Sequence, residues 1–197
     1  MPAANVLPYQ IIAGVCDVYF APVGEPFPAV DAAPAGNWLP LGHTDGGITV
    51  RHAQTIVPLR TDQVTAAVKA VRSEEDLEIS FAVAELTADN YALVLNQVAS
   101  TPIADGGATG KVVNMYRGGF GVETLSLLVR GEHLSPEGDF NLQYEVPSCY
   151  QSEAPEAGFT KDEKAMLQCT FLAIAALAFE PGSEDADIFG VLRIGTQ

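Results

Sequence analysis

The feature that most constrains the fold is a strict alternation of side-chain character near the middle of the chain. Its two sets are Leu77, Ile79, Phe81 and Val83 on one parity, and Glu78, Ser80, Ala82 and Ala84 on the other. Successive side chains of a β-strand point to opposite faces, so this segment predicts a half-buried strand. A chain organised around such a strand needs a sheet with one face packed on a core.

Further strands are expected towards the C-terminus, at residues 121–130, 139–151 and 165–179. In the second of these, Asn141, Gln143 and Glu145 alternate with apolar residues, which predicts a face that is wet or lines a polar channel. The run Leu172–Phe179 is apolar throughout, as in a strand buried on both faces, although its alanines leave a helix open. The segment 87–99 is the one strong helix pattern, with Thr87 as its N-cap and apolar residues recurring at i, i+3, i+4 and i+7.

Residues 48–76 predict a long hairpin, because two strand-like segments flank a Thr-Asp-Gln turn. Within it, residues 51–72 carry four bases against one acid, whereas the next stretch, 73–90, carries six acids and no base. We therefore expect the hairpin to pair with the acidic body of another copy, a solvated loop being the alternative. A head-to-tail contact of this kind would build rings or filaments. The candidate inter-subunit contacts are Arg51, Arg60, Asp62, Gln63, Lys69 and Arg72.

Composition excludes several classes of protein. The 197 residues carry a formal charge of −15, which argues against binding in a nucleic-acid groove, because phosphate affinity comes mainly from Lys and Arg. The length favours one domain, over 15–180, between arms at 1–14 and 181–197. The longest apolar run, nine residues at 171–179, is too short for a membrane helix, so no membrane partner is expected. Three scattered cysteines predict reduced core residues in a reducing compartment.

The sequence shows no arrangement of residues that points to catalysis, a cofactor or a metal. The glycine-rich segment 105–112 has Asp105 and Val112 where a phosphate-binding loop needs Gly and Ser or Thr. The three histidines, His43, His52 and His133, have no ligand spacing and are expected on the surface. Glu123, Glu132 and Glu145 lie on or near expected strands, where a solvated or channel-facing role outweighs an acid/base pair. We therefore expect no enzyme, no cofactor and no metal site.

Several segments together resemble the major tail tube protein of long, flexible-tailed bacteriophages. They are VYFAPVGEPFPAV with a downstream Trp38, then DGGITV, the TDQ turn, LEISFAVAELT and TADNYALVLNQV. The likeness is best over about residues 15–100. It implies a mainly β fold, a β-sandwich or barrel-like tail tube domain with one flanking helix, a long hairpin and extended terminal arms. It also implies hexameric rings that stack around an electronegative lumen.

The resemblance implies a structural role in the virion tail after synthesis in the bacterial cytoplasm. The implied partners are further copies of the chain and other tail proteins, namely the tape measure, tail terminator and distal tail proteins. Phage DNA would pass through the lumen without specific binding. Two alternatives remain at this stage: another virion β-protein, such as a head decoration or tail-completion protein, and a carbohydrate-binding β-sandwich. The second would need exposed aromatic platforms, whereas aromatic residues make up only 8% of the chain.

Overall fold

The computed structural model describes residues 15–96, 101–102, 110–113, 115, 121–133, 140–157, 161, 164–175 and 189–194. These residues form a mainly β protein with one short helix, which confirms the expected fold class. The strands are β1 (Cys16–Pro22), β2 (Leu39–Pro40), β3 (Thr44–Thr61), β4 (Val64–Val83), β5 (Thr101–Pro102), β6 (Lys111–Val112), β7 (Leu125–His133), β8 (Phe140–Gln151), β9 (Leu167–Ala173) and β10 (Val191–Ile194).

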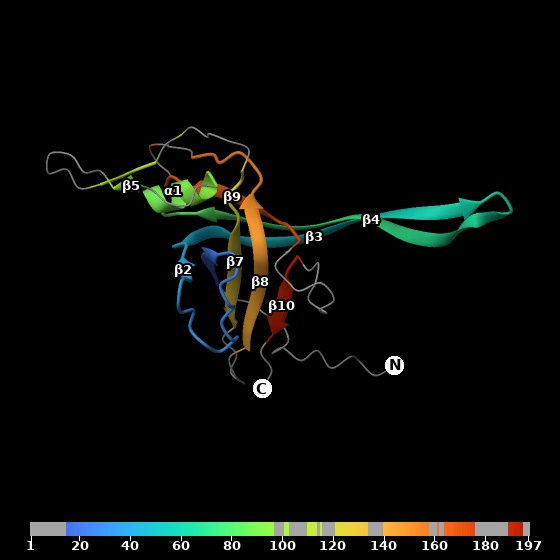
Figure 1. The fold of residues 1–197 in the computed structure, drawn as a ribbon, viewed down its shortest axis with the longest axis horizontal. Helices are drawn as coiled ribbons and strands as arrows, with labels where there is room; N and C mark the ends of the chain where they lie inside the picture. The colour runs from blue at the N-terminus through green and yellow to red at the C-terminus, as the bar shows by residue number, and fades with distance from the viewer. Residues whose placement is uncertain are drawn as a thin grey trace.

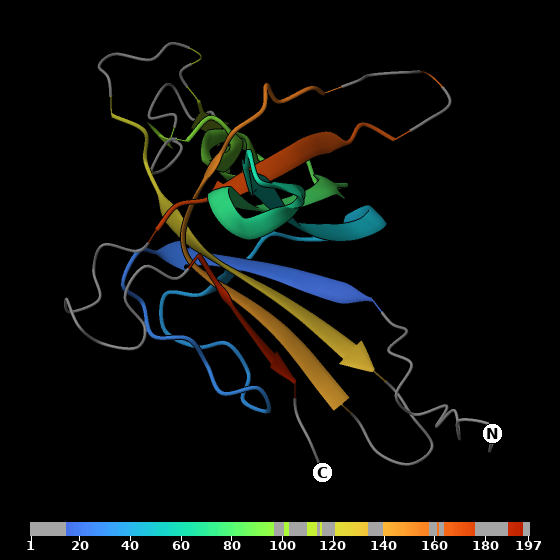
Figure 2. The ribbon, with the colours of Figure 1, turned by 90° about the vertical axis from the view of Figure 1, so that its right-hand side faces the viewer.

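One antiparallel sheet contains most of these strands, in the order β2-β1-β7-β8-β9-β4-β3, with β10 paired to β8. Strand β8 is the junction, because its first half pairs with β10 and its last three residues pair with β9. The sheet folds over at this strand into two facing layers (Figure 2). The first layer is β2-β1-β7-β8-β10, and the second is β9-β4-β3.

A bulge between β7 and β8 accompanies this fold-over. Leu127 lies opposite Val146 whereas Leu125 lies opposite Cys149, so β8 contains one residue more than β7 between these pairs. Pro147 lies within this bulge, a position where a proline's missing N–H is tolerated. Its carbonyl instead accepts a hydrogen bond of 2.8 Å from the Ser126 hydroxyl.

The core lies between the two layers. Phe81 of β4 and Phe171 of β9 stack with ring centroids 5.8 Å apart, and both are buried. They pack in one cluster with apolar side chains of β1, β7 and β8, namely Val18, Leu127, Val129 and Val146. The alternation at 77–83 therefore marks residues that face this core, as its period predicted.

The helix α1 (Ala88–Val94) packs against the same core through Leu93 and Val94. The Thr87 hydroxyl caps it by accepting a hydrogen bond of 3.1 Å from the Asn90 amide, as expected for this N-cap. The helix is shorter than the expected 87–99. Asn96 has a φ of +53°, a left-handed conformation that cannot continue a helix. The part of the prediction from residue 97 to 99 lies outside the described residues.

The two chain ends differ in what the structure describes. The expected arm at 1–14 lies outside the described residues. Of the expected arm at 181–197, residues 189–194 are described, and β10 adds to the first layer of the sheet. Strand β9 ends at Ala173 and so includes only the first two residues of the apolar run 172–179. The last four residues of that run are not described.

The hairpin of β3 and β4 is the most prominent feature of the molecule, because it projects far beyond the two layers (Figure 1). Its base is part of the second layer, where β4 pairs with β9. Its outer part, residues 54–74, is exposed at every position. From here on, the arm means residues 54–74 alone, and not the terminal segments 1–14 and 181–197.

Candidate functional site

The arm exposes an unusual number of aliphatic side chains. Six of them are between 41% and 57% exposed, namely Ile56, Val57, Leu59, Val64, Val68 and Val71. A two-stranded hairpin is at best marginally stable in water without packing against something else. Exposed apolar surface of this kind marks a contact site on a soluble protein.

The pairing register places apolar residues on both faces of the arm. Val57 lies opposite Val71 on one face, and Pro58 lies opposite Ala70 on the other. Neighbouring pairs along a hairpin alternate between its two faces, so neither face is purely polar. The arm can therefore be covered on both sides by a partner. The residues predicted as contacts from the sequence are all charged or in the turn. The apolar run Ile56–Leu59 also indicates a contact surface, and it was missed.

The six predicted contact residues divide between the root and the tip of the arm. Arg51 and Arg72 lie near the root and are already paired within the chain, with Nη1 atoms 3.4 Å from Glu78 and 2.8 Å from Glu75 respectively. The remaining four lie in the outer part of the arm, which we call the tip. Asp62 and Gln63 form the turn, Arg60 precedes it, and Lys69 of β4 lies opposite Leu59.

The tip carries the arm's two bases without an acidic partner. Arg60 donates a hydrogen bond of 2.5 Å to the Thr65 carbonyl, and Lys69 lies opposite Leu59. Within the described residues, neither base forms an ion pair with a carboxylate. These two side chains are therefore the members of the predicted set that remain available to an acidic partner.

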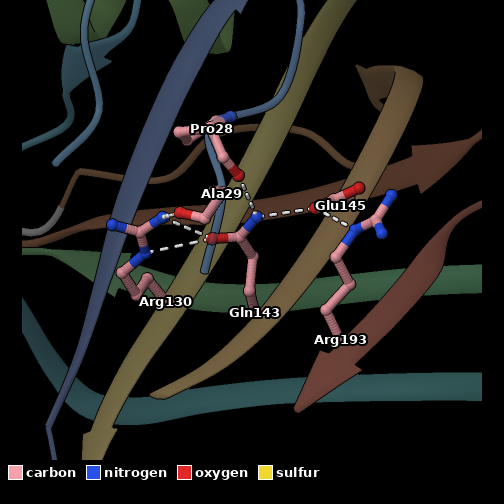
Figure 3. A network of polar contacts seen from close by, with 6 residues as sticks. All are labelled: Pro28, Ala29, Arg130, Gln143, Glu145 and Arg193. Atoms are coloured by element: carbon pink, nitrogen blue, oxygen red, sulfur yellow. Dashed lines mark hydrogen bonds and ion pairs between the residues drawn. The ribbon is translucent and has the colours of Figure 1, made fainter. Parts of the chain in front are cut away.

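A buried polar network crosses the outer face of the first layer and corrects the expected wet face of β8. Gln143 and Glu145 are 0% and 3% exposed. Gln143 Nε2 donates to the Pro28 carbonyl at 2.9 Å and to Glu145 Oε1 at 2.6 Å (Figure 3). The loop between β1 and β2 covers Gln143, and Glu145 is held between Gln143 and Arg193 of β10, so these side chains face neither solvent nor a channel. Glu145 is likewise neither the solvated nor the channel-facing carboxylate that was expected.

Two arginines complete this network from opposite sides. Arg130 of β7 donates to the carbonyls of Ala29 and Ala32, at 3.1 and 2.6 Å, and to the side chain of Gln143. Arg193 of β10 donates from Nε to Glu145 Oε1 at 2.7 Å. The network thus ties the β1–β2 loop and the C-terminal strand to β8. Its polar atoms are satisfied because they bind one another or backbone carbonyls, which makes their burial tolerable.

The described cysteines and histidines lie either in the core or on the surface. Cys149 and Cys169 are buried, which raises the pKa of both thiols, that of Cys169 to about 12. The described histidines are on the surface, as expected: the side chains of His43 and His52 are 92% and 49% exposed. The side chain of His133 lies outside the described residues. No group of three potential metal ligands occurs in the part of the chain that the structure describes.

Two further observations bear on the class of protein. The large hydrophobic side chains that are exposed among the described residues are aliphatic or methionine, and Trp38 is buried against Phe27. An aromatic platform for a sugar is therefore not found on the described surface. No helix within the described ranges is long and apolar enough to cross a membrane.

The comparisons with known proteins agree with the resemblance noted in the sequence. A family model for the phage tail tube protein matches residues 8–181, which include the hairpin, the helix and both layers except β10. No curated protein matches the chain. Members of this family are structural components of the virion tail and are generally not enzymes. The match covers most of the chain, and the chain therefore belongs to the phage tail tube protein family.

Proposed function

We propose that six copies of this chain close into a ring, and that the rings stack into a tube with an electronegative lumen. Phage DNA passes through this lumen during ejection and binds to no specific residue. The observation that carries the proposal is the arm, whose residues 54–74 are exposed in the isolated subunit although six of them have large aliphatic side chains. Contact with neighbouring copies would bury this surface.

Charge supports contact between copies of the same chain. The protein has a formal charge of −15, yet Arg60 and Lys69 in the outer part of the arm form no ion pair among the described residues. A basic tip meets attraction on almost any part of another acidic subunit. Because the tip and the surface that receives it are different, the contact is head-to-tail, a kind of contact that can close a ring or extend a stack of rings. The tape measure, tail terminator and distal tail proteins would then set the length and the ends.

The same charge suits passage of DNA. A wall of acidic subunits repels phosphates and offers them few places to bind. The repulsion acts only close to the wall, since the Debye length is about 8 Å at physiological salt. A strand of DNA would therefore slide rather than adhere.

Electron microscopy of the concentrated protein tests this proposal. We expect hollow tubes with a regular ring repeat, alone or after addition of disrupted tail ends as nuclei. The variant Lys69→Glu should remain folded by circular dichroism but form few or no tubes, because it reverses one charge of the tip.

The matched control is Lys161→Glu, which changes the net charge equally on an exposed residue of the body. Normal tubes from the control and none from Lys69→Glu would support the arm as the contact. Equal assembly of both variants would show that the charge of the tip is not needed for tube formation. Absence of the protein from virion tails would overturn the tube itself.

A further inference from the structure

The arm meets the body at a β-bulge. Thr55 pairs with Glu74 but the next residue, Ile56, pairs with Arg72, so Ser73 is one extra residue in β4. A bulge bends its strand and increases the local twist. It lies at the root of the arm, since every residue of 54–74 is exposed while Glu75 is half-buried. The bulge therefore sets the direction in which the arm leaves the body.

One carboxylate spans this bulge. Oε2 of Glu75 accepts a hydrogen bond from Arg72 Nη1 at 2.8 Å, and Oε1 lies 2.7 Å from Nε2 of His52 on the neighbouring strand. Arg72 belongs to the arm, whereas His52 lies opposite Leu77 at the edge of the core. Each oxygen of Glu75 thus binds one side of the bend. The Ser73 hydroxyl adds a bond of 3.2 Å to the Thr55 carbonyl.

The neighbouring acid provides a contrast. Glu74 has the same charge and flanks the same bulge, but it lies on the opposite face of the hairpin and accepts a bond of 3.3 Å from the Thr55 hydroxyl. That bond joins two directly paired residues and does not cross the bulge. The chain therefore supplies two adjacent carboxylates, of which one connects the arm to the root.

We infer that Glu75, held by His52 and bound to Arg72, fixes the orientation of the arm before assembly. A two-stranded ribbon bent at a bulge needs such a contact to hold its angle, because every residue of 54–74 is exposed and none belongs to the hydrophobic clusters of the described residues. This inference rests on the proposed function, in which the angle of the arm determines where its tip meets the next copy. Glu75 is thus a positioning residue for assembly.

Distances between spin labels on the arm and the body test the orientation directly, in the full chain and without any polymer. The labels are placed at Gln63→Cys, in the turn of the hairpin, and at Gln168→Cys, an exposed position of β9, with Cys16→Ser to remove the half-buried native thiol. We expect one narrow distance distribution for this background. Glu75→Gln and Arg72→Gln should broaden it, and Glu74→Gln should leave it narrow.

The thermal unfolding midpoint separates positioning from folding, because exposed ion pairs contribute little to stability. We expect all three variants to melt close to the background. In tube assembly, the critical concentration should rise roughly fivefold for Glu75→Gln, since misdirected arms lower the fraction of competent subunits. Equal distance distributions in Glu75→Gln and Glu74→Gln would overturn the inference, whether or not tubes form. Broadening without any tube formation would support it and count against the proposed function alone.

Discussion

The ion pair between Glu145 and Arg193 fastens the C-terminal strand to the body, and removing its base should be costly. The Glu145 side chain is 4% exposed, so the variant Arg193→Met leaves a carboxylate that has lost its only cationic partner among the described residues. Breaking a fully buried pair costs about 3–5 kcal/mol. Here the cost should be smaller, because Arg193 is 55% exposed and water reaches its side of the pair.

The amide of Gln143 also remains as a donor to Glu145 after this substitution. We therefore expect Arg193→Met to lower the free energy of unfolding by about 2 kcal/mol. For a chain of this size such a loss lowers the melting temperature by about 4–8 °C. Urea unfolding of the monomer, followed by circular dichroism, measures the free energy.

The double variant Arg193→Met with Glu145→Gln is the control, because it replaces the stranded charge by a neutral amide. It should recover at least half of the lost free energy. A cost below about 0.5 kcal/mol for Arg193→Met would place the pair among ordinary surface pairs and refute the reasoning. Additive losses in the double variant would do the same.

Two further predictions concern titration and reactivity. The Lys164 ammonium, 2.7 Å from Asp45, holds the pKa of that carboxyl below its ordinary 3.8, first by a hydrogen bond and then by charge. The pair therefore stabilises the fold above pH 3.8, and this stabilisation is lost as the pH falls through the lowered pKa of Asp45. In a carbon-13 NMR titration, Lys164→Ala should raise the pKa of Asp45 towards 3.8. An unchanged pKa would contradict the pairing. Burial raises the pKa of all three thiols. A thiol reagent at pH 8 should therefore label half-buried Cys16 slowly, and should label buried Cys149 and Cys169 only on unfolding. Rapid labelling of either buried cysteine would show that the core opens.

Local patterns predicted the strands well where one face is buried. The alternation at 77–83 identified core residues because a half-buried strand imposes a period of two on its sequence. The same reasoning located β7 and β8. It misread the polar face of β8, because Gln143 is covered by a loop more than 100 residues earlier in the chain and Glu145 is bound by Arg193 of the C-terminal strand. Nothing in their own neighbourhood signals that cover.

The candidate contact residues show the same limit. The four bases of the hairpin are equivalent in the sequence pattern, yet Arg51 pairs with an acid on the neighbouring strand and Arg72 with an acid along its own strand. Whether a base has an acidic partner depends on the pairing register of β3 and β4 and on the bulge at Ser73. A shift of the register by one residue would change these pairs. The charge pattern of the sequence singles out the hairpin as a whole, and the pairing register separates its root from its tip.

The central claim is that the arm is buried between copies of this chain in a tube. A cryo-EM reconstruction of tails from the source phage, at a resolution that traces β3 and β4, tests it most directly. We predict density for a ring of six subunits, with the aliphatic residues of 54–74 packed against neighbouring copies. Arms that project into solvent, or tail tubes built from a different protein, would contradict the account.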